Sequence, residues 1–260
     1  MGMTVADLPT AAPSITGAEP APGAALLVEV WSDVVCPWCY VGLAQLDAAL
    51  ADFDHADQVQ VVLRSYQLDP SAPVHDDVPL VTRLARKYAT SEDQIRAQQE
   101  RLRQAGAELG IDFQFDRTAR GNTLDAHRLL HLAAEHGLQA ALKHRLLQAY
   151  FTEGQAVGEH DVLRQAATTV GLDPAEVDEV LAGDRHLDEV ATDVDTAREL
   201  EITGVPFFLV DGRLGIPGAQ RPELLLRVLQ RAWRDREDAQ DLGAALGGDA
   251  TCGPDGCAVG

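Results

Sequence analysis

Two cysteines separated by two residues, Cys36 and Cys39, are the residues of this chain best suited to covalent chemistry. They lie in the run Cys36-Pro37-Trp38-Cys39, where a disulfide can form with little movement of the backbone. A short apolar segment, residues 26–31, precedes them, and the apolar spacing after Pro37 predicts a helix that begins there. A cysteine pair between a strand and a helix start is typical of a thiol–disulfide redox site.

The predicted helix start gives the two thiols different roles. Unpaired backbone N–H groups and partial positive charge at a helix N-terminus favour the thiolate, which is the attacking form of a cysteine. We expect Cys36, before the first turn, to be the exposed nucleophile with the lower pKa of the pair. Cys39 lies about one turn inside the helix, so we expect it to be more buried and to resolve the mixed disulfide.

Two other interpretations of this pair remain. A structural zinc ion needs four ligands, and no further cysteine occurs between positions 39 and 252. Two inert core cysteines are disfavoured because Pro37 and Trp38, after the polar Ser32-Asp33, indicate a surface turn. A redox pair is therefore the preferred interpretation.

His127 and His131 lie four positions apart on a predicted helix, a spacing that metal sites use. No nearby residue completes a zinc set, and no Glu stands between them in the protease arrangement, so we interpret them as surface or helix-packing side chains and expect no metal. Asn122 and Thr123 precede this helix. We expect them to cap it, because their side-chain oxygens can accept hydrogen bonds from free N–H groups.

The charge of the chain limits its partners. Its 260 residues carry a formal net charge of −20, so phosphate backbones and anionic membranes repel it, and neither nucleic-acid nor membrane partners are expected. No apolar run is long enough to predict a transmembrane helix. Residues 1–25 contain no Lys or Arg and no apolar run of the kind that a secretory signal needs. We interpret them as a disordered leader and expect a cytoplasmic protein.

The apolar patterns predict one mixed sheet that is interrupted in the chain by a helical segment. The first part is a strand at 26–31, a helix from Pro37 and a strand at 59–66. Several helices follow between about 70 and 184, and then a helix from 187 to about 202. The last part is a strand at 206–210, a hairpin turn at Asp211-Gly212, a second strand and a final helix to about Asp235.

A second cysteine pair, Cys252 and Cys257, lies in a segment rich in Gly, Ala and Asp, residues 236–260, which we expect to be a flexible tail. Gly253 and Gly256 let the short loop between these cysteines close into a disulfide. The pair could relay electrons to or from the first pair, or form a passive bond. A metal role would need two further ligands.

Residues 34–42, Val-Val-Cys-Pro-Trp-Cys-Tyr-Val-Gly, resemble the active-site segment of the DsbA-like thioredoxin superfamily, and in particular its cytoplasmic FrnE-type branch. Residues 122–129, Asn-Thr-Leu-Asp-Ala-His-Arg-Leu, resemble a helix segment shared with the related 2-hydroxychromene-2-carboxylate isomerases. Residues 204–208, Gly-Val-Pro-Phe-Phe, resemble the loop that carries the cis-proline of the superfamily, and residues 218–220 the turn before its last helix. The resemblance covers most of the chain, and the second cysteine pair also fits the FrnE-type branch.

The resemblance implies an α/β protein with a thioredoxin-like fold and a large all-helical insertion. The thioredoxin-like domain would comprise residues 26–70 and 185–235, and the insertion residues 71–184. A cis peptide bond between Val205 and Pro206 would lie beside the cysteines, although spacing alone also permits a trans proline that starts a strand.

The same resemblance implies the substrate-binding residues. The backbone of Val205, next to Pro206, would be free to pair with an extended substrate. Pro37, Trp38, Asn122 and Thr123 would border the same cleft. Of these residues, Asn122 and Thr123 are also the expected helix caps.

The function that the resemblance implies is thiol–disulfide exchange with protein disulfides, with Cys36 as nucleophile and Cys39 as resolving thiol. No bound cofactor is expected. A thiol reductant or oxidant, including glutathione-like small thiols, would be the electron partner. Two alternatives remain: a glutathione-dependent isomerase or transferase of small aromatic molecules, and a non-catalytic chaperone. Such isomerases commonly have Ser at the first cysteine position, so the presence of both cysteines favours redox chemistry.

Overall fold

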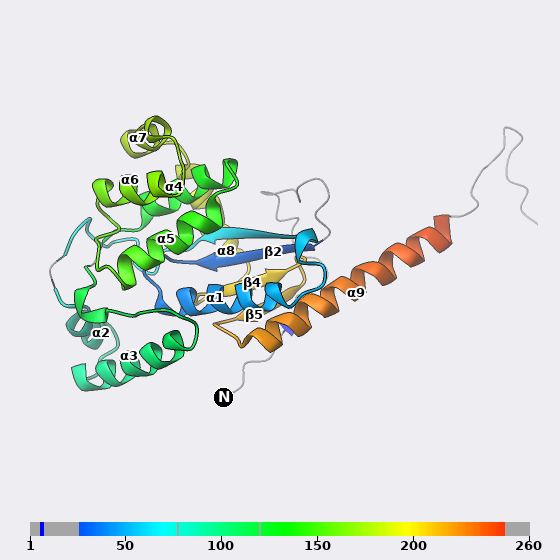
Figure 1. The fold of residues 1–260 in the computed structure, drawn as a ribbon, viewed down its shortest axis with the longest axis horizontal. Helices are drawn as coiled ribbons and strands as arrows, with labels where there is room; N and C mark the ends of the chain where they lie inside the picture. Colours follow the sequence, from blue (N-terminus) through cyan, green and yellow to red (C-terminus); the bar gives the residue numbers. More distant parts are fainter. Residues whose placement is uncertain (1–5, 8–25, 77, 120, 248–260) are drawn as a thin grey trace, which may run out of the picture.

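The computed structural model describes residues 6–7, 26–76, 78–119 and 121–247. Within these residues, five strands form one sheet in the order β1-β5-β4-β2-β3 (Figure 1). Strand β2, between β4 and β3, is parallel to β3 and antiparallel to β4, so the sheet is mixed, as predicted. The strands are β1 (Ala6–Asp7), β2 (Leu26–Ser32), β3 (Val59–Ser65), β4 (Phe207–Val210) and β5 (Leu214–Pro217).

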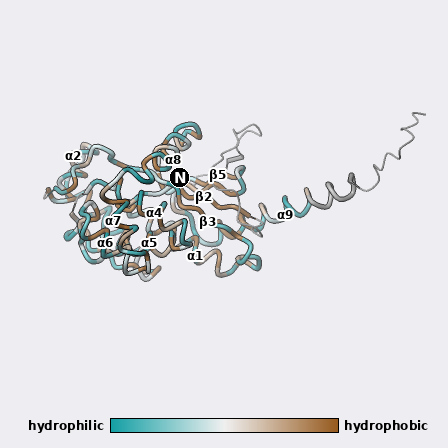
Figure 2. Tube along the Cα trace, turned by 90° about the horizontal axis from the view of Figure 1, so that it is seen from above, coloured by the Kyte–Doolittle hydropathy of each residue, from teal (hydrophilic) through white to brown (hydrophobic). Residues whose placement is uncertain are grey.

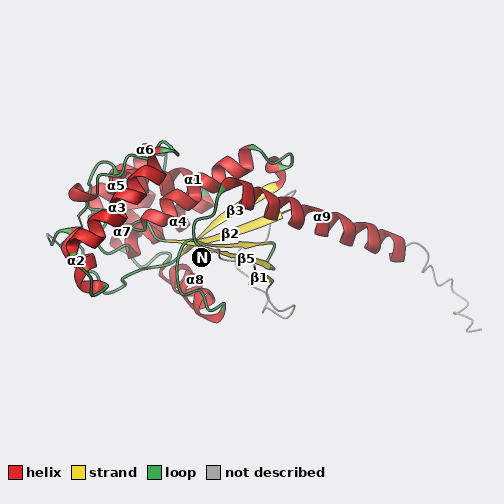
Figure 3. Cartoon of the chain, turned by 90° about the horizontal axis from the view of Figure 1, so that it is seen from below, coloured by secondary structure: helices red, strands yellow, loops and turns green. Residues whose placement is uncertain are grey.

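Helices cover both faces of this sheet. Helices α1 (Pro37–Ala51) and α9 (Pro222–Gly247) pack on one face, and α8 (Leu187–Glu199) lies on the other (Figure 3). Side chains alternate along a strand, so Val28 and Val30 of β2 are buried in the main core, whereas Trp31 packs in a second cluster beneath α8. Figure 2 shows the strands as hydrophobic traces between these layers, as expected for a sheet buried on both faces.

The long segment between β3 and α8 is helical, as predicted, and lies at one end of the sheet (Figure 1). Its first two helices form a hairpin beside α1, and the others pack on one another and on the sheet. The helices are α2 (Leu80–Lys87), α3 (Glu92–Ala107), α4 (Leu124–Glu135), α5 (Gln139–Phe151), α6 (His160–Thr169) and α7 (Pro174–Ala182), with short 3-10 helices η1 (Ala56–Gln58) and η2 (Phe115–Arg117).

A buried ion network holds α8 against the sheet. Arg64 of β3 pairs with Glu29 of β2 at 2.6 Å and with Asp193 of α8 at 3.3 Å. Asp193 also accepts hydrogen bonds from the backbone N–H of Ser65 at 2.8 Å and, through its own carbonyl, from the Trp31 indole at 3.0 Å. Because each buried charge has a partner, this polar cluster is compatible with an apolar core.

The predicted hairpin at Asp211-Gly212 is confirmed. Both residues adopt positive φ angles, 55° and 64°, which Asp and Gly tolerate better than most residues. Strands β4 and β5 pair antiparallel around this turn, with Val210 opposite Leu214.

The two ends of the chain differ from the expectation. Within the predicted disordered leader, Ala6–Asp7 pairs antiparallel with β5. The final helix continues to Gly247, well past the predicted end at Asp235, because residues 236–242 contain no Pro or Gly that would stop it. The ion pair of Arg236 with Asp211, at 2.6 Å, ties this extension to the hairpin. The flexible-tail prediction is therefore wrong for residues 236–247, and Cys252 and Cys257 lie outside the described residues.

Candidate active site

Cys36 is the N-cap residue of α1, immediately after β2. Its backbone is extended and Pro37 occupies the first turn, as the sequence predicts. The carbonyl of Cys36 accepts hydrogen bonds from the N–H groups of Cys39 and Tyr40, at 3.1 and 3.3 Å, which starts the helix. The Cys36 sulfur therefore lies at the positive end of a 15-residue helix.

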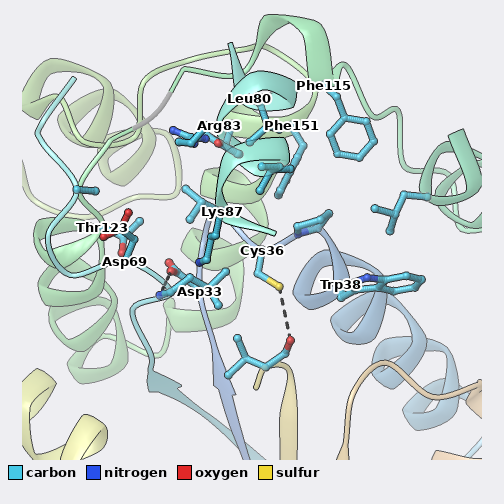
Figure 4. Close-up of a pocket in the computed structure, with 18 of the residues that line it drawn as sticks. Asp33, Cys36, Trp38, Asp69, Leu80, Arg83, Lys87, Phe115, Thr123 and Phe151 are labelled. Atoms are coloured by element: carbon cyan, nitrogen blue, oxygen red, sulfur yellow. Dashed lines mark hydrogen bonds between the residues drawn. The ribbon is translucent and has the colours of Figure 1, made fainter. Parts of the chain in front are cut away.

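Both thiols are free, and they differ in burial. Cys39 is completely buried, as predicted, but only 5% of Cys36 is exposed, so the expectation of an exposed nucleophile is wrong. The sulfur of Cys36 lies 3.6 Å from the Val205 carbonyl, in the loop before β4, and faces a cavity that the α2–α3 hairpin also lines (Figure 4). This contact joins residues 169 positions apart, so the sequence alone does not show it.

This cavity has a volume of about 790 Å³. Among the predicted site residues, Cys36, Pro37, Trp38 and Val205 line it. Four large hydrophobic side chains are exposed among the described residues, and three of them, Trp38, Leu68 and Tyr88, also line this cavity. Exposed apolar side chains therefore gather at this cavity.

The Val205–Pro206 peptide bond is cis, as the resemblance implied. The carbonyl of Val205 accepts a hydrogen bond from the Cys36 sulfur at 3.6 Å, so this loop lies beside the nucleophile. Gly42 of α1 packs directly against Pro206: a Cβ at this position would be 2.8 Å from the proline Cγ. The absence of a side chain at Gly42 thus allows the close approach of α1 and the loop.

Asn122 has a different place from the one implied. Its side-chain oxygen accepts from the N–H of Leu124 at 2.9 Å, so it caps α4 as predicted, whereas Thr123 makes no side-chain cap. Its side-chain amide donates to the carbonyls of Pro70 and Ala72, at 3.2 and 2.9 Å. Asn122 holds the loop after β3 and does not line the cavity, although the flanking Thr123 does.

A group of buried charged residues lies beneath the cysteines, and it was not predicted. His127 of α4 is buried, with its Nε2 3.4 Å from a carboxylate oxygen of Asp33. The other oxygen of Asp33 accepts from the N–H of Leu68 at 2.8 Å. Lys143 of α5 is 0% exposed and donates from Nζ to the Ser32 carbonyl at 3.3 Å. His127 is therefore not a surface residue: it is buried on α4, as a helix-packing side chain would be, and it also pairs with Asp33, which was not predicted.

The environment changes the pKa values of these groups. Burial raises the pKa of Asp33, but the hydrogen bond with His127 and the charge of Lys143 outweigh it and hold the pKa below its usual value. Burial lowers the pKa of His127 and of Lys143. Burial and the neighbouring Cys36 raise the pKa of Cys39 well above its usual value, and the positive charge of Lys143 opposes this rise.

His131 lies on the α8 side of the sheet. Its Nε2 is 3.1 Å from the Ser65 hydroxyl and 3.1 Å from the carboxylate of Asp193. One nitrogen faces both oxygens, so these residues are not arranged as a Ser–His–Asp relay, in which the two ring nitrogens have separate partners. Within the described ranges, no three His, Cys, Asp or Glu side chains are grouped to bind a metal ion.

The sequence contained signals for the missed residues. Asp33 stands three positions before Cys36, and His127 lies within the stretch that carries part of the resemblance. Lys143 lies among Leu142, Leu146 and Leu147, which form the buried side of α5. A lysine among such positions indicates a buried charge, and buried charges cluster at functional sites.

The second cysteine pair is attached to the far end of α9. The start of this helix adjoins the site, since Ala219 lies 3.6 Å from the Cβ position of Gly42. The helix then runs away from the site for 26 residues (Figure 1), which is about 39 Å. Cys252 follows Gly247 by five residues, which span at most about 17 Å when extended. While α9 is helical, Cys252 therefore cannot reach Cys36 of the same chain.

Comparisons with known proteins agree with this geometry. The family model of the DSBA-like thioredoxin domain matches residues 27–230. The uncharacterised protein YwbO of Bacillus subtilis is 30% identical over 209 residues, which cover 78% of this chain and 94% of YwbO.

Two solved structures are also similar. The probable DsbA oxidoreductase of Streptomyces coelicolor is 39% identical with a TM-score of 0.76, covering 90% of this chain and 99% of that one. The cytosolic disulfide reductase DsbM of Pseudomonas aeruginosa is 21% identical with a TM-score of 0.58, covering 80% and 98%, and supports the fold alone. In the part of the chain that the structure describes, no helix has both the length and the apolar composition needed to cross a membrane.

Proposed function

Since the chain belongs to the DsbA-like thioredoxin domain family, we propose that it exchanges thiols and disulfides through Cys36 and Cys39, with disulfides of polypeptides as substrates. One observation carries the proposal. Cys36 caps α1 inside a cavity, next to the Val205 carbonyl, with the fully buried Cys39 one turn behind it. This arrangement provides an attacking thiol, a resolving thiol and a backbone contact for substrate.

In the first step, the thiolate of Cys36 attacks one sulfur of the substrate disulfide. A bond forms between the Cys36 sulfur and that sulfur, the substrate S–S bond breaks, and the second substrate sulfur leaves as a thiolate. The N-terminus of α1 favours the negative charge on Cys36 before the attack. We propose that the backbone of Val205, which contacts the sulfur at 3.6 Å, pairs with the substrate chain and aligns its disulfide.

In the second step, Cys39 attacks the Cys36 sulfur, which releases the other substrate thiol and leaves a Cys36–Cys39 disulfide. Cys39 must first lose its proton, and its burial opposes this. Lys143 is the cation whose charge favours the Cys39 thiolate, and it stands beside the Ser32-Asp33 segment that leads into Cys36. We propose that Lys143 stabilises the Cys39 thiolate during this step, while Asp33 and His127 hold the segment in place.

The rim of the cavity supports a polypeptide substrate. Trp38 is 48% exposed, and Leu68 and Tyr88 are also exposed beside it. Exposed apolar side chains gathered at one site favour contact with an apolar segment of another chain. We further propose the cytoplasm as the compartment, as for the cytosolic reductase DsbM, with a small thiol such as glutathione as the electron partner.

An insulin-reduction assay with dithiothreitol tests this proposal. The wild type should accelerate the reaction, Cys36→Ser should abolish the acceleration, and Cys39→Ser should accumulate a mixed disulfide that mass spectrometry detects. Full activity of both variants would refute the thiol mechanism. A wild type that is inactive here but isomerises aromatic glutathione adducts would favour the isomerase alternative, and one that only prevents aggregation would favour the chaperone.

A further inference from the structure

The cavity around Cys36 contains two cations that the mechanism above does not use. Arg83 and Lys87 both lie on α2, which forms the cavity wall opposite the cysteine (Figure 4). They are four positions apart, so they share one face of the helix and are separated by about 6 Å along its axis. In a chain with a formal net charge of −20, two adjacent cations facing a nucleophile are unexpected on composition alone.

Neither cation is neutralised by a carboxylate in the described part of the chain. Lys87 is exposed and its ammonium lies 5.9 Å from the ring centre of Tyr88. The buried Nη1 of Arg83 has no hydrogen-bond partner among the described residues. A buried guanidinium N–H without an acceptor is unfavourable, so an oxygen ligand at this atom would satisfy it.

The acids of the cavity have other partners. Asp33 contacts His127 and the N–H of Leu68. Asp69 accepts a hydrogen bond from the Ser71 hydroxyl at 2.7 Å. The α2 wall therefore carries local positive charge, whereas the molecule as a whole repels anions.

We propose that Arg83 and Lys87 form an anion subsite that binds a carboxylate of the disulfide substrate, so that this protein prefers acidic disulfides. The inference rests on the proposed function and names the substrate class of the same site. A volume of about 790 Å³ is within the usual range for a small-molecule site. The carboxylate could belong to a small acidic disulfide or to an acidic residue beside a polypeptide disulfide, since both present the same group.

The test reaction is the oxidation of the reduced protein by a small disulfide. The reduced Cys36–Cys39 pair reacts with one glutathione disulfide to give a Cys36–Cys39 disulfide and two glutathione molecules, so the protein supplies both electrons. Cystamine, a cationic disulfide, undergoes the same reaction and serves as the comparison. The measured quantity is the ratio of the two second-order rate constants in single-turnover experiments with pre-reduced protein.

We expect the wild type to prefer glutathione disulfide. Lys87→Gln should lower the glutathione-to-cystamine ratio about fivefold, the effect of losing one partly exposed ion pair, and Lys87→Glu should lower it further. Arg86→Gln is the matched control, because Arg86 is exposed on the same helix and does not line the cavity. Its ratio should stay within about twofold of the wild type.

Calorimetry with S-methylglutathione, which cannot exchange, gives a second readout. Its dissociation constant should increase in Lys87→Gln, because binding is weaker, and stay unchanged in Arg86→Gln. Equal ratios and equal dissociation constants in the two variants would overturn the subsite. A wild type that exchanges with neither disulfide would refute the proposed function, and calorimetry would then still decide whether the cations bind a carboxylate.

Peptide disulfides flanked by Glu or by Lys distinguish the two sources of the carboxylate. A preference for the Glu-flanked peptide that Lys87→Gln removes would identify acidic polypeptides as substrates. A preference limited to glutathione disulfide would identify small acidic disulfides. Either result supports the subsite.

Discussion

Replacing Lys143 with methionine separates the chemical role of this buried cation from its effect on stability. Methionine is uncharged and flexible and fills a similar volume among the leucines of α5. Lys143 is fully buried, its hydrogen bond goes to the Ser32 carbonyl, and among the described residues no carboxylate forms an ion pair with it. The variant therefore removes a charge without leaving a separated ion pair.

We expect Lys143→Met to slow the step in which Cys39 attacks. A cation close to a thiolate changes the thiolate population by about tenfold or more. The second step should therefore slow about tenfold at pH 7, and the pH at which it reaches half its maximal rate should rise. The first step, attack by Cys36, should change less, because Lys143 interacts more strongly with Cys39 than with Cys36.

The effect on stability should have the opposite sign. Removing an unpaired buried charge should raise the free energy of unfolding by about 1–2 kcal/mol at neutral pH. Burial lowers the pKa of Lys143 below 10.5, so between the lowered value and 10.5 the unfolded chain binds more protons than the folded one. Wild-type stability therefore gains as the pH rises through this window. The variant lacks this gain, so the difference in the free energy of unfolding between the variant and the wild type should shrink as the pH approaches 10.5.

The reaction of the reduced protein with 5,5′-dithiobis(2-nitrobenzoate) measures both steps, because Cys36 releases one coloured thiolate and Cys39 releases the second. Urea unfolding at several pH values measures the stability. Arg227→Met, on the exposed side of α9, is the control for the change in net charge. If the second coloured thiolate is released from Lys143→Met with the wild-type rate and pH profile, Lys143 does not assist the attack by Cys39. If the urea midpoint of Lys143→Met is lower than that of the wild type, the buried charge does not destabilise the folded protein.

Two further predictions concern the packing of α1 and the second cysteine pair. Gly42→Ala places a Cβ 2.8 Å from Pro206, so it should reduce the free energy of unfolding by about 1–3 kcal/mol and slow thiol–disulfide exchange by moving Val205. The control is Gly204→Ala, because a Cβ at that position meets no atom within 4 Å. Urea unfolding compares the two variants, and equal stabilities would contradict the prediction. Electron transfer between Cys252/Cys257 and Cys36/Cys39 should occur between two chains. The observed first-order rate constant, measured with Cys36–Cys39 pre-oxidised, should therefore rise in proportion to protein concentration. An observed rate constant that does not depend on concentration would show that the second pair reaches Cys36 of its own chain.

The sequence by itself determined the features that depend on neighbouring residues. Cys36 and Cys39 are predicted at a helix start because Pro37 and the following apolar spacing place a helix there. The turn at Asp211-Gly212 depends on the preference of two adjacent residues for positive φ. The cis bond before Pro206 followed from the resemblance, and the single mixed sheet followed from the order of its elements.

Only the tertiary structure decided which distant side chains meet. Asp33 and His127 are 94 positions apart, and helical periodicity assigns His127 to a face of α4 without showing what that face contacts. Lys143 reaches the active site because α5 packs beside β3 and α1. Cys36 contacts Val205, 169 positions away, because β4 pairs with β2 and brings the loop before β4 beside the start of α1. Local rules predict each element, whereas burial and charge pairing depend on how the elements pack together.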